Sequence, residues 1–461
     1  MANVIKLRKG LDINLTGRAQ EQMLSVKSLT EYALVPDDFP GLLPVKAAVE
    51  YALVPDDFVG VTPRVTVREG DYVRAGDPLF VDKGCPEVGF ASPVSGTVSA
   101  VERGERRKVL RVKVTADAQQ EYADFGVKDV AGLSADEVKD ALLKAGLFGY
   151  ITQLPYAVAT RPDTAPKAIF VSALRDKPLQ GDFEYELKGQ EHDFQTGLTA
   201  LSRIARVCLG IGARQTAEAL TGAKDVEVNV FDGPCPAGNV GVQVNHVAPV
   251  NKGEVVWTVD PTAVIFFGRL FNTGRVNLMR RVAVAGSRVK QTGYADVLVG
   301  TPLKQILAGN VADGGRHVRI LNGNPLTGAV ADEAAVLGAH TSEVTVIPEG
   351  DDVHEAFGWM LPRLDDFSTS RSYFSWLQGG KTYDLDARIK GGERHMIMSG
   401  EYDRVLPMDI YGEYLIKAIL AEDIDKMEQL GIYEVSPEDF ALAEFVDSSK
   451  LELQAIVRRG L

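Results

Sequence analysis

Residues 65–80 read V-T-V-R-E-G-D-Y-V-R-A-G-D-P-L-F, and this stretch decides the fold of the N-terminal part of the chain. Apolar and polar residues alternate in it, which predicts half-buried strands, and the Gly-Asp pairs at 70–71 and 76–77 predict tight turns between them. Two similar stretches follow, A-S-P-V-S-G-T-V-S-A-V at 91–101 and K-V-L-R-V-K-V at 108–114. Short strands joined by such turns predict a small, flattened β-barrel.

This barrel pattern resembles the sandwich of biotinyl and lipoyl carrier domains. Those carriers hold their modified lysine at the tip of an exposed hairpin, and Lys83 in V-D-K-G is the corresponding candidate. The K-G-C-P sequence that begins there does not match the surroundings of a carrier lysine, so we favour a solvated loop residue. A carrier domain modified on Lys83 is kept as an alternative.

The composition indicates a globular chain of about three domains. The 461 residues carry a formal net charge of −13, which argues against a nucleic-acid partner because such binders show a basic surface. The three cysteines, Cys85, Cys208 and Cys235, are too few and too scattered for a disulfide framework or a thiolate metal site. We therefore expect no metal in this chain and a reducing compartment.

The chain shows no signal for membrane insertion or secretion. Its N-terminus lacks the apolar region of a signal peptide. The longest apolar run, near 263–267, is far shorter than the roughly 20 residues of a membrane-spanning helix. We expect any association with a membrane to go through a partner.

Nine residues, E-Y-A-L-V-P-D-D-F, occur twice, at 31–39 and 50–58. Two copies are too few for a repeat architecture. The paired carboxylates in each copy could serve acid–base chemistry, but each pair follows a proline, and Pro-Asp is typical of turns. We predict a duplicated strand and turn beside the barrel.

From residue 167 onward, strands alternate with helices. The predicted elements are strands at 168–174, 207–211 and 226–231 and a helix at 193–206. This alternation predicts a Rossmann-like parallel sheet with helices on both faces. Ligand crevices in such sheets lie at the carboxyl ends of the strands, where the sequence places Arg175-Asp176-Lys177 and the loop F-D-G-P-C-P-A-G at 231–238.

Motifs of nucleotide and metal chemistry are absent. The first strand of the sheet runs into S-A-L-R-D-K-P-L instead of G-x-G-x-x-G, and no Walker A sequence occurs. His354-Glu355 begins like H-E-x-x-H, but Gly358 stands at the position of the second histidine. The sequence therefore predicts no catalytic residues.

The remaining sequence predicts two further units. Residues 276–290 alternate apolar and polar residues and precede a short apolar helix pattern, which predicts a β-grasp or SLBB-like unit. Helix signals at 409–421 and from Ser436-Pro437 predict a C-terminal helical region. The expected fold is a multidomain α/β protein, α+β overall. Its parts are a barrel-sandwich hybrid at 1–125 with the duplicated insertion near 31–58, a Rossmann-like βαβ domain at 126–274, a β-grasp domain at 275–404 and the helical region at 405–461.

Short motifs in a fixed order give a resemblance that covers essentially the whole chain. They are R-K-G-L-D (8–12), G-D-x-V (70–73), S-P-V-S-G (92–96), F-D-G-P-x-P-A-G (231–238), G-x-L-F-x-T-G (268–274), F-G-W (357–359), S-x-x-R-S (368–372) and V-L-P-M-D (405–409). In this order they resemble the A subunits of the sodium-translocating NADH:quinone reductase. More distantly, they are similar to the C subunit of the Rnf complex and the flavin-carrying subunit of complex I.

The chain departs from these relatives at positions that hold cofactors. The Rnf-type relative has a glycine-rich flavin loop before the parallel sheet, whereas residues 154–162 here read L-P-Y-A-V-A-T-R-P. Family members commonly carry C-x-F-x-C-P near the C-terminus, and Ala443 and Asp447 replace both cysteines here. The segment at 31–49 also looks like an insertion, which makes the first repeat copy the extra one. We expect that this chain binds no redox cofactor.

The resemblance implies a peripheral subunit on the cytoplasmic face of the bacterial inner membrane. Its complex, a translocase, would couple NADH oxidation and quinone reduction to sodium export. NAD, FMN or FAD, iron–sulfur centres and quinone would be bound in the assembled complex, whose other subunits, including membrane-embedded ones, are the expected partners. The isolated chain would position partners without being catalytic. A stand-alone flavin-binding oxidoreductase of the Rnf C or complex I type is the alternative.

Two groups of residues are candidate sites. Phe357 and Trp359 would form an apolar slot for a quinone headgroup, with Arg371 as a hydrogen-bond donor, although a packing role is the more common use of such residues. The second group is a candidate surface for a partner or ligand, although its prolines and glycines also suit a rigid turn. It consists of Asp232, Gly233, Pro234, Pro236 and Gly238.

Overall fold

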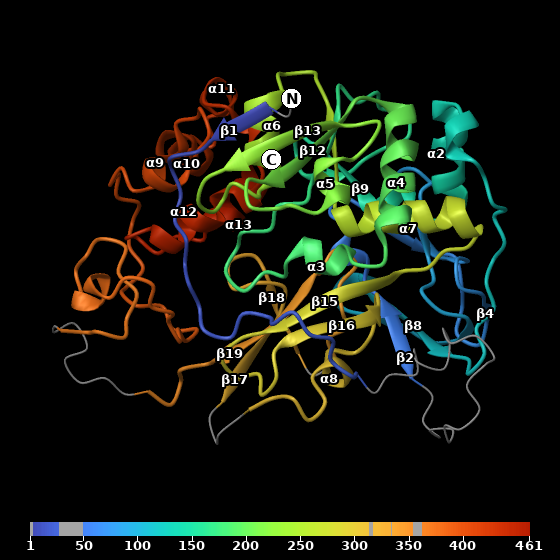
Figure 1. Ribbon diagram of the computed structural model, residues 1–461, viewed down its shortest axis with the longest axis horizontal. Coiled ribbons are helices and arrows are strands. Elements are labelled where there is room, and N and C mark those ends of the chain that lie inside the picture. The colour runs from blue at the N-terminus through green and yellow to red at the C-terminus, as the bar shows by residue number, and fades with distance from the viewer. Residues whose placement is uncertain (1–2, 27–48, 313–316, 333, 354–361) are drawn as a thin grey trace.

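The computed structural model describes residues 3–26, 49–312, 317–332, 334–353 and 362–461. Its strands form sheets of seven, five, four and three strands, and helices cover the largest sheet (Figure 1). This architecture confirms the predicted fold class, a multidomain α/β protein with a barrel sandwich, a parallel layer, a β-grasp unit and a helical C-terminal region. No helix within the described ranges is long and apolar enough to cross a membrane.

The barrel sandwich consists of two small antiparallel sheets. One has the order β2 (Glu50–Leu53), β8 (Val109–Ala116), β7 (Gly96–Arg103) and β4 (Tyr72–Val73), and the other β3 (Pro63–Val65), β5 (Pro78–Asp82) and β6 (Gly89–Ala91). The rings of Phe80 and Phe90, on the neighbouring strands β5 and β6, stack with their centroids 4.7 Å apart and belong to the hydrophobic core. Gly70 and Gly76 adopt positive φ angles of 91° and 99°, as the predicted turns require.

The second copy of the nine-residue repeat forms β2 and a 3-10 turn, η1 (Pro55–Asp57). β2 pairs with β8 in the sandwich, so this copy is part of the sheet. The turn predicted from Pro-Asp is confirmed here. The first copy, at 31–39, lies outside the described residues.

The seven-stranded sheet is a doubly wound layer. Its order is β1 (Asn3–Lys6), β13 (Glu227–Asp232), β12 (Val207–Gly212), β11 (Ile169–Ser172), β14 (Val256–Val259), β9 (Ile151–Leu154) and β10 (Val158–Ala159). The first five strands are parallel, and β9 joins antiparallel to β14. The associated helices are α2 (Ala135–Lys144), α3 (Phe183–Leu187), α4 (Glu191–Ile204), α5 (Glu218–Thr221), α6 (Val240–Val247) and α7 (Pro261–Thr273).

The N-terminal strand belongs to this layer and not to the sandwich. β1 pairs in parallel with β13, and Ile5 lies beside Phe231. The edge of the parallel sheet offers β1 a ladder of backbone hydrogen bonds. The predicted domain boundaries stay predictions.

Helix α7 contains the apolar run that the sequence showed at 263–267. Eleven of its thirteen residues are buried, because α7 packs against α4 beneath the sheet. The two helices approach closely at Gly197 and Gly268. A Cβ atom at Gly268 would lie 1.7 Å from the Asp193 carbonyl oxygen, and one at Gly197 would lie 2.0 Å from that of Val264. The run is thus a core helix.

The β-grasp unit is the five-stranded sheet. Its order is β16 (Gly293–Leu298), β15 (Met279–Ala285), β19 (Glu343–Pro348), β17 (Val318–Asn322) and β18 (Ala329–Val330), with the helix α8 (Leu303–Ile306) after the first hairpin. β15 and β19 are parallel neighbours, and the outer pairs are antiparallel. The predicted hairpin followed by a helix is confirmed.

The C-terminal region is helical and lies at the end of the molecule opposite α2 (Figure 1). Its helices are α9 (Tyr402–Val405), α10 (Gly412–Leu420), α11 (Ile424–Gln429), α12 (Ala441–Val446) and α13 (Leu453–Gly460), with 3-10 turns η6 (Ile432–Glu434) and η7 (Pro437–Phe440). Ser436 and Asp439 form a capping box at the start of η7, with Pro437 in the first turn as the sequence predicted. The apolar core of this region includes Leu7 and Phe231 from the parallel layer.

Candidate functional site

The parallel sheet reverses its winding direction between β11 and β14. From β11 the chain proceeds to β12 and β13 on one side, and it then returns to add β14 on the other side. The loops that leave two such strands diverge to opposite faces of the sheet, so a crevice opens at their carboxyl ends. This crevice is the position at which an α/β sheet most readily binds a ligand.

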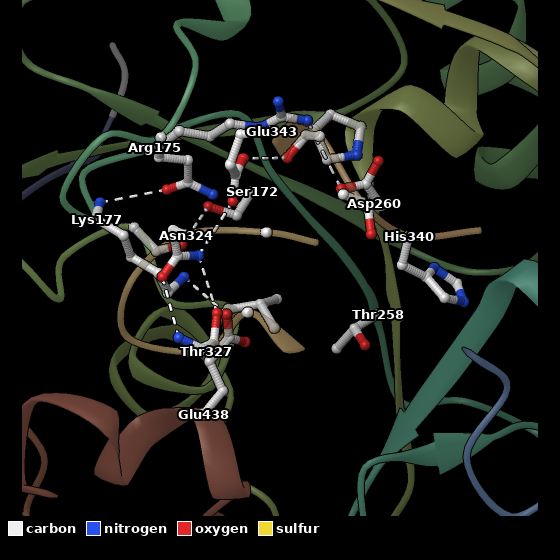
Figure 2. A pocket seen from close by; sticks show the side chains of 18 of the residues that line it. Ser172, Arg175, Lys177, Thr258, Asp260, Asn324, Thr327, His340, Glu343 and Glu438 are labelled. Carbon is white, nitrogen blue, oxygen red and sulfur yellow. Dashed lines mark hydrogen bonds and ion pairs between the residues drawn. The ribbon is translucent and has the colours of Figure 1, made fainter. Parts of the chain in front are cut away.

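A cavity of about 400 Å³ occupies this crevice. β11 and the residues after it contribute Ser172, Arg175 and Lys177, and β14 contributes Thr258, with Asp260 directly after the strand (Figure 2). The β-grasp unit and the C-terminal region close the other side. Their side chains at the cavity include those of Asn324, Thr327, His340, Glu343 and Glu438.

Arg175 is held by two carboxylates. Its Nη1 lies 2.5 and 2.6 Å from the two oxygens of buried Glu186, and its Nη2 lies 3.7 Å from Asp260. Asp260 also caps α7 by accepting a hydrogen bond of 2.9 Å from the Thr262 N–H. Burial alone would raise the pKa of Asp260, but Arg175 and Arg280 lower it below its ordinary value. Asp260 is therefore an ionised carboxylate in a fixed position.

Lys177 is also paired within the chain. Its Nζ lies 2.7 Å from Oε1 of Glu438, which the C-terminal turn η7 brings to the cavity. Burial lowers the pKa of Lys177, but the Glu438 carboxylate outweighs it and raises the pKa above the ordinary value of lysine. The ammonium group stays charged, so it is not a free amine nucleophile.

His340 lies against the rings of Phe58 and Tyr150, with centroid distances of 5.4 and 5.5 Å. Burial, assisted by Arg280, lowers the pKa of His340 to about 4, so its imidazole is neutral at pH 7. The Tyr150 hydroxyl is buried and has no hydrogen-bond partner among the described residues. This corner brings together residues from the sandwich, the parallel layer and the β-grasp unit.

The acidic and basic groups of the crevice largely compensate one another. Glu343, for example, accepts hydrogen bonds from Asn324 Nδ2 at 3.1 Å and from Ser342 Oγ at 2.7 Å. A flavin or nucleotide phosphate needs cations or N–H groups that are free to donate. Arg175 and Lys177 already have carboxylate partners, so the residues present do not fit such a phosphate.

The F-D-G-P-C-P-A-G loop lies between this crevice and a second cavity of about 500 Å³. Asp232 and Gly233 line the second cavity, and Gly238 lines the first. Gly238 N–H donates a 2.8 Å hydrogen bond to Asp176 Oδ2. Pro234 and Pro236 are part of the same bend, and Pro234 lies beside Gly10. The loop borders both cavities, and its role as a ligand or partner surface stays a prediction.

The three predicted quinone-contact residues are not brought together by the described part of the structure. Phe357 and Trp359 lie outside the described residues. Arg371 is exposed, and its guanidinium carbon lies 5.2 Å from the centroid of the Trp376 ring. It lines neither of the two cavities above.

The sequence places Arg175 and Lys177 just after a parallel strand. In the structure both residues follow β11 and line the crevice, as predicted. Sequence reasoning missed Asp260, His340 and Tyr150. A signal existed for Asp260, because V-W-T-V-D-P at 256–261 is an apolar strand followed by an N-cap and a proline. His340 and Tyr150 carry no comparable signal, because only tertiary packing brings them to the site.

Lys83, the candidate carrier lysine, is exposed in the connection between β5 and β6. Within the described ranges, no group of three or more His, Cys, Asp or Glu side chains is placed to hold a metal ion.

Comparison with protein families covers most of the chain. The NqrA N-terminal barrel-sandwich hybrid domain matches residues 5–50 and 43–117, the NqrA second alpha/beta domain matches 133–276, and the NQRA C-terminal domain matches 281–333. The A subunit of the Na(+)-translocating NADH-quinone reductase from Neisseria meningitidis serogroup B (strain MC58) is 32% identical, over 99% of this chain and 98% of the relative. The chain belongs to the NqrA family.

A second member of the family, from Yersinia pestis bv. Antiqua (strain Angola), is 34% identical over 99% of this chain and 98% of its own length. It too is named as the A subunit of the Na(+)-translocating NADH-quinone reductase. The resemblance inferred from short motifs is thus confirmed. A crystal structure of NAD+-reducing [NiFe]-hydrogenase in the air-oxidized state aligns with a TM-score of 0.32 at 12% identity, over 64% of this chain and 57% of that one.

Proposed function

We propose that this chain is the A subunit of a sodium-translocating NADH:quinone reductase and that its role is docking and positioning. The observation that carries this proposal is the end-to-end similarity, at 32–34% identity over 99% of the chain, to proteins with that name. The crevice supports the positioning role, because side chains of three regions of the fold meet there in compensated charge pairs.

The proposed location is the cytoplasmic face of the bacterial inner membrane, where the chain is a peripheral subunit. Sodium translocation requires a membrane-embedded path, so its partners include membrane-embedded subunits of the complex. This chain would attach to them through its surface.

The chain holds no redox cofactor of its own in this proposal. NAD, FMN or FAD, and iron–sulfur centres belong to other subunits of the assembled complex. The proposal is supported by the crevice between β11 and β14, where Arg175 pairs with Glu186 and Lys177 pairs with Glu438. The sequence has three cysteines, fewer than the four thiolates of a common iron–sulfur cluster.

Quinone contact is proposed for Phe357, Trp359 and Arg371. The apolar slot and the donor that a quinone headgroup needs would then come from this segment of the chain. A photoreactive quinone analogue in the intact complex tests the idea. Labelling of residues 357–371 supports it, and labelling confined to other subunits ends it.

The main proposal is tested by a native pull-down from detergent-solubilised membranes with an affinity tag on this chain. We expect membrane-embedded subunits and flavin in the eluate, together with NADH:quinone reductase activity. The isolated chain, purified separately, should be colourless. Stoichiometric flavin or iron in the isolated chain would instead support the stand-alone oxidoreductase, and recovery without membrane subunits would contradict the proposal.

A further inference from the structure

The exposed side of α10 carries aromatic and apolar residues together with one cation, Lys417, where a surface helix is normally polar throughout. Tyr411 and Tyr414 are 68% and 55% exposed, and Leu420, at the end of the helix, is 47% exposed. Ile424, the first residue of α11, is 68% exposed. We call these four residues the α10–α11 face.

The α10–α11 face lies outside the apolar core of the C-terminal region. The opposite side of α10 already packs into the core through Leu415, Ile416 and Ile419, which are all buried. A contiguous group of exposed apolar side chains on a folded protein commonly marks an interaction site. The rings of Tyr411 and Tyr414 lie edge to face, with centroids 6.2 Å apart.

A groove continues from this face. It has a volume of about 430 Å³, and buried Ile419, Met427 and Ile432 form its floor. Leu420 and Ile424 stand at its rim and are therefore shared with the α10–α11 face. A groove of this volume has room for an apolar side chain from another molecule, and such an anchor supplies affinity in helix-in-groove complexes.

The same part of the chain is strongly acidic. Residues 401–434 contain nine Asp and Glu residues and three Lys and Arg residues, a net charge of −6 out of −13 for the whole chain. Near the groove, Asp423 pairs with Lys426 and Glu428 pairs with Lys252. Glu422 and Asp425 make no ion pair with any described residue, so they are available to a basic partner. Lys417 on α10 and Arg459 in the groove lining are exposed cations of the same region.

We propose that the α10–α11 face and its groove bind a cytoplasmic segment of a membrane-embedded partner subunit, one that combines an apolar anchor residue with lysines or arginines. The inference rests on the proposed function and names the chemistry of the partner. Cytoplasmic loops of membrane proteins carry an excess of Lys and Arg, which complements the charge of this region. Direct binding to lipid is disfavoured, because anionic headgroups would be repelled by the excess of carboxylates in residues 401–434.

Site-specific photo-crosslinking in membranes that contain the complete complex tests the proposal. A benzophenone amino acid is placed at position 414 or 420, and at position 127 as a control, because Val127 is also highly exposed, at 69%. Crosslinks from 414 and 420, but not from 127, should map to a Lys/Arg-bearing loop of a membrane-embedded subunit. Crosslinks only to lipid, to a second copy of this chain or to a soluble subunit would overturn it, as would no crosslink at all.

Two variants provide an independent readout. Leu420→Ser with Ile424→Ser removes the apolar rim, and Glu422→Lys with Asp425→Lys reverses the unpaired charges. Each should weaken retention of the chain on the membrane subunits about tenfold or more, whereas Val127→Ser should not. Thermal melts of the purified variants should match the wild type, because all of these side chains are exposed or at the rim.

The outcomes separate this inference from the function beneath it. If the wild-type chain recovers the membrane subunits and both double variants are retained equally well, the α10–α11 face is not the docking site although the proposed function stands. If the wild-type chain recovers no membrane subunit, the proposed function itself is contradicted, and the inference falls with it.

Discussion

Asp12 accepts a 3.0 Å hydrogen bond on its Oδ1 from the backbone N–H of Cys235. This contact joins two motifs that are more than 220 residues apart, R-K-G-L-D at 8–12 and F-D-G-P-C-P-A-G at 231–238. Leu11 N–H donates to the Cys235 carbonyl oxygen at 2.8 Å, so the two segments exchange hydrogen bonds. The N-terminal segment thereby fixes the loop that borders both cavities.

Gly10 allows this contact, and we expect Gly10→Ala to destabilise the protein. Its φ is +142°, and a Cβ atom there would lie 2.3 Å from the Cys235 carbonyl oxygen. Gly70→Ala is the matched control, because Gly70 also has a positive φ, +91°, but a Cβ atom there would meet nothing within 4 Å. Strain alone should cost each variant about 1–2 kcal/mol, and the collision should add to the loss in Gly10→Ala. Urea unfolding measures both, and equal losses would refute the role of the contact.

The Lys177–Glu438 pair should connect the C-terminal region to the parallel layer energetically. Glu438→Gln leaves the buried Lys177 ammonium without its counter-ion, and we expect a loss of about 1–3 kcal/mol, less than for a fully buried pair because Glu438 is 41% exposed. Lys177→Met should rescue part of that loss in the double variant. Glu254→Gln, in the exposed Lys167–Glu254 pair, is the control and should cost under about 1 kcal/mol. A double-mutant cycle with no coupling energy would contradict this prediction.

The sequence predicted those parts of the fold that local patterns determine. The capping box of Ser134 and Glu137 marks the start of α2, and the structure contains both of its hydrogen bonds. The ends of the parallel strands led directly to Arg175 and Lys177. In each case residues close in sequence carry the information, because caps, turns and strand periodicity depend on neighbours along the chain.

The rest depends on contacts between distant residues. No local pattern indicates that β1 pairs with β13, or that Glu438 reaches Lys177 from the other end of the chain. His340 and Tyr150 look like ordinary residues until the sandwich, the layer and the β-grasp unit pack together. The apolar run in α7 is too short for a membrane span, and the sequence alone does not show that it forms a fully buried core helix.

Asp57, in the second repeat copy, should make stability rise as the solution becomes more acidic. Its carboxylate accepts a 2.8 Å hydrogen bond from Ala339 N–H. Burial, with a smaller contribution from Asp56, raises its pKa to about 6. Because this exceeds the unfolded value of about 3.9, the folded state binds more protons between about pH 4 and pH 6. This stabilisation is present in acid and is lost as the pH rises through about 6.

The measurement for Asp57 compares wild type with Asp57→Asn. Asparagine keeps the acceptor oxygen for Ala339 but does not titrate. On going from about pH 7.5 to pH 5, the free energy of unfolding of the wild type should gain about 1–1.5 kcal/mol relative to the variant. A difference that is constant between the two pH values would show that the buried carboxyl group does not take up a proton.

His340 should act in the opposite direction. Burial lowers its folded pKa to about 4, below the unfolded value of about 6.5, so the unfolded state binds the extra proton between these values. Stability from this group is therefore complete above about pH 6.5 and falls as the pH drops toward 4. His340→Phe keeps the ring against Phe58 and Tyr150 and cannot titrate. Between about pH 7.5 and pH 5 the wild type should lose about 2 kcal/mol relative to this variant.

The signs for His340 and Asp57 differ, so the two pH series check each other in the same buffers. General charge repulsion in acid would lower the free energy of unfolding of the wild type and of both variants by the same amount. The difference between the wild type and each variant would then not change with pH. The imidazole proton signals of His340 give a second measure that does not depend on unfolding. If this titration gives a pKa of about 6.5 in the folded protein, the His340 imidazole is solvated. The packing of His340 against Phe58 and Tyr150 would then be contradicted.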